Sequence, residues 1–127
     1  MVYDGKISTG RLGETAAAAF LRNNGYRIIA RNFRRRLGEI DIIASDKDVI
    51  CFIEVKTRRQ DSFGAPEEAV SRQKQARISR AALLFLKQNN LLDKKARFDV
   101  VSIKYFDSHP EVRLIRSAFE LDKKFCY

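Results

Sequence analysis

The stretch Val49-Ile-Cys-Phe-Ile-Glu-Val-Lys-Thr57 decides the fold. Its β-branched and aromatic residues predict a strand, and its apolar first half predicts a central strand that is covered on both faces. Glu54 and Lys56 lie two positions apart, so their side chains share one face of this strand. A charge on a central strand is costly unless a partner or a metal ion satisfies it. Glu54 and Lys56 are therefore the first candidate functional residues.

A third charged residue, Asp41, lies in the preceding strand-like stretch, Gly38-Glu-Ile-Asp-Ile-Ile-Ala-Ser45. The polar residues 46–48 predict a turn between the two stretches. A two-residue loop would place Asp41 opposite Glu54, and a four-residue loop would place it diagonally. Both registers put the two carboxylates on one face, whereas an odd loop or a β-bulge would separate them.

The rest of the chain predicts an α/β fold. Thr9 is a suitable N-cap for an alanine-rich helix that ends before Gly25, and a second helix is expected from Pro66 to about Gln88. The other strands are expected at residues 26–33, 96–105 and 111–118. The order α-β-β-β-α-β-β predicts a mixed sheet flanked by helices, with a right-handed crossover between the parallel strands.

Composition narrows the function classes. The length of 127 residues indicates a single domain spanning residues 1–127. A net charge of +9 favours a polyanionic partner, nucleic acid first and an anionic membrane surface second. One His and two Cys exclude a zinc site rich in those residues, and they argue against a disulfide scaffold. Without a long apolar run, the protein is expected to be cytoplasmic and not to span a membrane.

The acidic pair has a functional and a structural interpretation. Two close carboxylates repel each other, and a divalent cation converts that repulsion into attraction; oxygen ligands suit Mg²⁺ or Mn²⁺. In a basic protein this favours metal-assisted hydrolysis of phosphodiesters, with Lys56 acting on the water or the phosphate. The structural alternative is the solvated face of a hairpin. Glu14 is a third acidic candidate that could equally well serve the helix dipole.

Several motifs resemble those of known proteins. Asp41 and the Glu54-Val55-Lys56 segment resemble the D…ExK core of the restriction-endonuclease-like nuclease superfamily. Gly13-Glu14 before an alanine-rich helix, Gly38-Glu-Ile-Asp41, Glu54-Val-Lys-Thr-Arg58 and Arg97-Phe-Asp-Val-Val101, taken together, resemble the YraN family of small bacterial proteins. Ile40 departs from the superfamily pattern, in which Pro often precedes the Asp.

The resemblance implies an αβββαβ core, here with one extra C-terminal strand. It implies metal ligation by Asp41, Glu54 and the backbone carbonyl of Val55, and a catalytic role for Lys56. Glu14 matches an acidic residue in the first helix of relatives that include Holliday-junction resolvases, which implies a part in the same metal site.

Basic residues supply a candidate surface for nucleic acid. They are Arg34, Arg35, Arg36, Arg58, Arg59, Arg72, Lys74 and Arg77. Such residues can follow phosphates without reading sequence. The leading hypothesis is a metal-dependent nuclease that acts on structured or branched nucleic acid, with DNA as the expected class. A nucleic-acid-binding module without catalysis and a protein-interaction module are the alternatives, and the last strand could support a homodimer.

Overall fold

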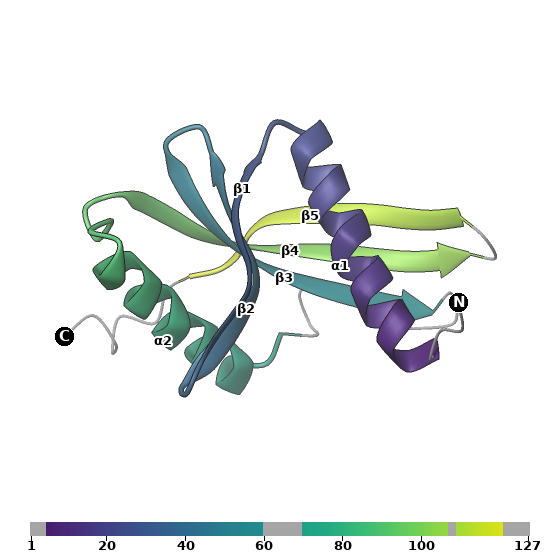
Figure 1. Cartoon of the computed structure of the whole chain (residues 1–127), viewed down its shortest axis with the longest axis horizontal. Helices are drawn as coiled ribbons and strands as arrows, with labels where there is room; N and C mark the ends of the chain where they lie inside the picture. Colours follow the sequence, from purple (N-terminus) through teal and green to yellow (C-terminus); the bar gives the residue numbers. More distant parts are fainter. Residues whose placement is uncertain (1–4, 60–69, 107–108, 121–127) are drawn as a thin grey trace.

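The computed structural model describes residues 5–59, 70–106 and 109–120, and it contains the predicted order of elements (Figure 1). These elements are α1 (Gly5–Asn23), β1 (Arg27–Arg35), β2 (Gly38–Asp46), β3 (Val49–Arg59), α2 (Arg72–Gln88), β4 (Lys95–Phe106) and β5 (His109–Phe119). In the described residues, neither helix is long and apolar enough to cross a membrane.

The five strands form one mixed sheet in the order β1-β2-β3-β4-β5. Neighbouring strands are antiparallel except β3 and β4, which run parallel and are joined through α2. The two helices cover different parts of the sheet in Figure 1. This arrangement confirms the expected αβββαβ core, with β5 as the extra strand at one edge.

Strand β3 is covered on both faces, as its apolar sequence predicted. Phe52 packs in a cluster with Phe85 of α2, and their ring centroids are 6.1 Å apart. Cys51 and Ile53 belong to a second cluster, which contains Leu21 of α1. The alternation of side chains along β3 therefore serves two hydrophobic cores.

Both predicted helix starts were wrong. Helix α1 begins at Gly5, four residues before the expected cap at Thr9. Helix α2 begins at Arg72, and its N-cap is Ser71, whose side chain accepts a hydrogen bond from the Lys74 N–H. The extended backbone of Ser71 (φ −64°, ψ 161°) rules out a continuous helix from Pro66, which itself lies outside the described residues. Capping-type residues mark where a helix can begin, and other positions compete for that role.

The hairpin between β2 and β3 has a two-residue loop, because Asp46 pairs with Val49. Lys47 at this turn has a positive φ of 58°. The ladder continues as far as the pair Ile42 and Ile53. Both strands extend beyond that pair, and Figure 1 shows the β1–β2 hairpin leaving the direction of β3, β4 and β5. The sheet thus opens between β2 and β3, next to Asp41.

Candidate functional site

Asp41 lies where β2 and β3 separate. In the observed register, Asp41 and Glu54 follow directly after the pair Ile42 and Ile53, as the two-residue loop required. Oδ2 of Asp41 accepts a hydrogen bond of 2.8 Å from the backbone N–H of Val55. The carboxylate therefore satisfies a backbone donor of β3 where the ladder between the strands has ended.

The carboxyl groups of Asp41 and Glu54 are close enough to share a hydrogen bond. Glu54 is buried, with only 7% of its surface exposed. Burial of Asp41 and the nearby charge of Glu54 raise the pKa of Asp41 to about 7, although the Val55 N–H acts in the opposite direction. Asp41 therefore retains its proton up to about pH 7.

Two lysines approach the same oxygen of Glu54. Nζ of Lys56 lies 3.7 Å from Oε1 of Glu54, and Nζ of Lys74, from α2, is in direct contact with it. Burial lowers the pKa of Lys56, and the neighbouring Lys74 lowers it further. Burial opposes the charge of Lys74 too, but its hydrogen bond with Glu54 raises the pKa of Lys74 overall. Lys74 is thus the main counter-ion of Glu54.

Glu14 lies beside this pair on α1. Its Oε1 is 3.7 Å from Nε of Arg31, and this oxygen is buried without a hydrogen-bond partner. The charge of Glu14 contributes to the raised pKa of Asp41. A Cβ on the adjacent Gly13 would lie 2.3 Å from Oγ1 of Thr57, so glycine allows α1 to pack closely on β3.

The donor set fits a hard divalent cation. Within the described parts of the chain, no three His, Cys, Asp or Glu side chains form a ready-made ligand cluster. Asp41 and Glu54 offer two adjacent carboxylates, and a backbone carbonyl is the kind of further ligand that Mg²⁺ and Mn²⁺ accept. A cation would also replace the proton that the pair retains, so the residues fit such an ion.

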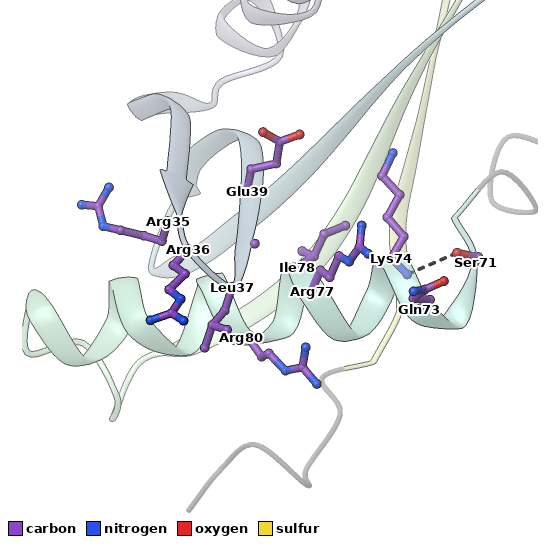
Figure 2. Close-up of a pocket in the computed structure, with 11 residues that line it drawn as sticks. Arg35, Arg36, Leu37, Glu39, Ser71, Gln73, Lys74, Arg77, Ile78 and Arg80 are labelled. Atoms are coloured by element: carbon purple, nitrogen blue, oxygen red, sulfur yellow. Dashed lines mark hydrogen bonds between the residues drawn. The ribbon is translucent and has the colours of Figure 1, made fainter.

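The basic residues are distributed unevenly around this pair. Arg34 forms an exposed ion pair with Glu39 at 3.4 Å, and Arg35 stacks over Phe33 at 4.1 Å from its ring centroid. The side chains of Arg58 and Arg59 lie outside what the structure describes. A groove of about 750 Å³ lies between the β1–β2 turn and the first half of α2 (Figure 2). The groove is lined by Arg35, Arg36, Leu37, Gly38, Glu39, Ser71, Gln73, Lys74, Arg77, Ile78 and Arg80.

A second carboxylate cluster surrounds Asp99, which is fully buried. Nε of Arg97 donates to Asp99 at 3.1 Å, and the Ser117 N–H donates to it at 2.9 Å. Arg97 also binds Asp46 at 2.9 Å and the hydroxyl of Tyr26 at 2.7 Å. Sequence reasoning used Arg97 and Asp99 only as part of the resemblance. Their alternation on a strand was the available signal for an ion pair.

The sequence predicted most of the residues that meet at this site, with one important exception. The structure gathers Asp41, Glu54 and Lys56, and it places Glu14 nearby. Lys74 was expected on the nucleic-acid surface; the structure places it in the lining of the groove and in contact with Glu54. Tyr26 is buried, and its hydroxyl group donates a hydrogen bond of 3.4 Å to Asp99.

Comparison with known proteins places the chain among bacterial relatives. A protein of Syntrophus aciditrophicus is 50% identical over 115 residues, which cover 91% of each chain. A protein of Acetivibrio thermocellus is 47% identical over 121 residues, covering 90% of this chain and 92% of the other. Both are described as UPF0102 proteins.

Among solved structures, the calcium complex of SfsA from Pyrococcus furiosus matches with a TM-score of 0.35 and 12% identity. The match covers 91% of this chain, which spans 63% of the SfsA chain. Residues 13–103 match the uncharacterised protein family UPF0102. With the YraN-like resemblance confirmed in this way, the chain belongs to the UPF0102 family.

Proposed function

We propose that the protein is a metal-dependent nuclease that hydrolyses phosphodiester bonds in structured or branched nucleic acid, with DNA as the expected class. The observation that carries this proposal is the proximity of the half-buried carboxyl group of Asp41 to the buried carboxyl group of Glu54, beside Lys56. A net charge of +9 supports a polyanionic substrate.

Asp41, Glu54 and the carbonyl of Val55 would hold Mg²⁺ or Mn²⁺, with Glu14 as a nearby acidic neighbour. When bound, such a cation polarises the phosphate and lowers the pKa of a coordinated water molecule. The Val55 N–H orients Asp41, and burial of Glu54 restricts the water around the pair.

Lys56 is suited to a role at the reacting phosphate. Its lowered pKa makes proton exchange at the amine easier than for an ordinary lysine. Its ammonium form can instead stabilise negative charge that develops on a phosphate oxygen. In either role Lys56 acts on the water or the substrate, so its loss should leave cation binding intact.

One observation favours the alternative of a nucleic-acid-binding module without catalysis. Lys74 already compensates the charge of Glu54, so this acid has a counter-ion without a metal. A module of this kind would bind nucleic acid through the same basic residues, and it would neither need nor respond to a divalent cation.

The test is a cleavage assay on labelled linear, single-stranded and branched DNA with Mg²⁺ and with Mn²⁺. We expect the wild type to cleave, and Asp41→Asn and Lys56→Ala each to lose at least about 100-fold in rate. Lys87→Ala, in the exposed last turn of α2, is the matched control and should cleave like wild type. A wild type that binds DNA without cleaving it would support the binding module. Cleavage that survives both substitutions would assign the activity to another site.

A further inference from the structure

The groove between the β1–β2 turn and α2 has an unusual charge composition. Five cationic side chains line it, against one carboxylate, Glu39. That carboxylate is paired with Arg34, which does not line the groove. The lining contains no aromatic residue on which a base could stack. Such a surface suits a run of phosphates rather than bases.

Close packing sets the geometry of this groove. A Cβ on Gly38 would lie only 2.1 Å from the carbonyl oxygen of Arg77, so the start of β2 lies directly against the backbone of α2. Within the described residues, the structure gives Arg36 and Arg77 no carboxylate partner, and both side chains are exposed. Figure 2 shows Arg36 extending over α2 from the β1–β2 turn.

Lys74 belongs to both the groove and the acidic pair. It lines the groove one turn before Arg77, and its ammonium group contacts Glu54. In Figure 2 its side chain rises from α2 toward the sheet. A single side chain therefore connects the groove with the candidate metal ligands.

We propose that this groove binds the phosphodiester backbone of the substrate strand, and that Lys74 moves from Glu54 to a substrate phosphate when a divalent cation binds the acidic pair. The identity of the cation rests on the proposed function. Without a cation, the buried Glu54 holds Lys74, because an unpaired buried charge is strongly unfavourable. A bound cation neutralises the charge of Glu54 in place of Lys74 and repels the ammonium group. The side chain of Lys74 is then free to contact a phosphate in the neighbouring groove.

The first experiment measures binding of a fluorescent single-stranded DNA of about 20 nucleotides, in EDTA and in Ca²⁺. We expect Arg77→Gln to weaken binding about tenfold under both conditions and to reduce the slope against log salt by about 0.7. Lys74→Gln should have little effect in EDTA and should weaken binding about tenfold in Ca²⁺. Lys87→Gln, at the other end of α2, is the control and should bind like wild type.

Two results would overturn the proposal. If Arg77→Gln binds like wild type, the groove is not the binding surface. If Lys74→Gln loses the same affinity in EDTA as in Ca²⁺, Lys74 does not exchange between Glu54 and phosphate. These assays measure binding, so the groove and the nuclease activity can fail separately. If Arg77→Gln weakens binding but the wild type cleaves no substrate, the groove is supported and the nuclease is rejected. If the wild type cleaves but the groove variants bind like wild type, the nuclease is supported and the groove is rejected.

A second experiment, without nucleic acid, measures whether Lys74 and the cation compete for Glu54. Binding of Mn²⁺ alone is followed by electron paramagnetic resonance of the free ion at pH 8, above the pKa of about 7 of Asp41. We expect Lys74→Gln to bind Mn²⁺ several-fold more tightly than wild type, because the competing ammonium group is gone. Weaker Mn²⁺ binding by Lys74→Gln would contradict the proposal that Lys74 leaves Glu54 when the cation binds. It would mean that Lys74 holds the ligands in place for the cation.

Discussion

The protein buries carboxylates in two regions, and the hydrogen-bond donors around them differ. Asp99 receives hydrogen bonds from Arg97, from the Ser117 N–H and from the hydroxyl of Tyr26. Asp41 receives one hydrogen bond from a backbone N–H and faces a second carboxyl group. Both lysines near this pair contact Glu54, on the same oxygen.

The difference favours a structural role for the Asp99 cluster and is the reason for proposing a functional role for the pair of Asp41 and Glu54. A buried charge that contributes only to folding is expected to have its donors in place. The cluster around Asp99 meets that requirement, and Asp46 has its pKa lowered by its hydrogen bond with Arg97. The pair of Asp41 and Glu54 meets it only in part, and the raised pKa of Asp41 measures the deficit. Strained titratable pairs of this kind occur preferentially at functional sites.

The largest expected effect is at the structural site. Asp99→Asn removes the charge that compensates Arg97, so the free energy of unfolding should fall by about 3–5 kcal/mol. Urea denaturation followed by circular dichroism measures this loss. A change below about 1 kcal/mol would show that Asp46 alone satisfies Arg97, and the contrast between the two regions would then be lost.

A smaller effect of opposite sign is expected for Asp41→Asn. The folded protein retains the Asp41 proton up to about pH 7, whereas the unfolded chain releases it near the ordinary value of 3.8. Between these values the folded state binds more protons, so the wild-type stability should fall as pH rises. The variant has no such ionisation and should be more stable than wild type at pH 8, by on the order of 2 kcal/mol.

Urea denaturation of both proteins at pH 4, 6 and 8 checks this dependence. The stability difference should grow from about pH 4 to about pH 7 and then level off, because in that range the unfolded chain has released the Asp41 proton while the folded protein still holds it. A variant that is less stable than wild type at pH 8 would mean that the Asp41 charge stabilises the fold. Asp41 would then belong with Asp99 as a structural residue.

Local sequence patterns predicted most of the fold and part of the site. The apolar run in β3 and the short polar turn before it determine the hairpin, and parity along the strands then brings Asp41 to Glu54. The contact of Lys74 with Glu54 could not be predicted from sequence, because it depends on how α2 packs after the crossover. The predicted helix starts were wrong for a related reason. Several residues can cap a helix, and tertiary packing selects among them.

The most direct test of the claim that Asp41 and Glu54 form a cation site is the melting temperature of wild type and Asp41→Asn at pH 8, with and without Mn²⁺. Saturating Mn²⁺ should raise the wild-type melting temperature by several degrees, because a ligand that binds only the folded state stabilises it. The shift should be small or absent in Asp41→Asn, although that variant should melt higher than wild type without metal. No shift in the wild type, or equal shifts in both proteins, would contradict a cation site at this pair.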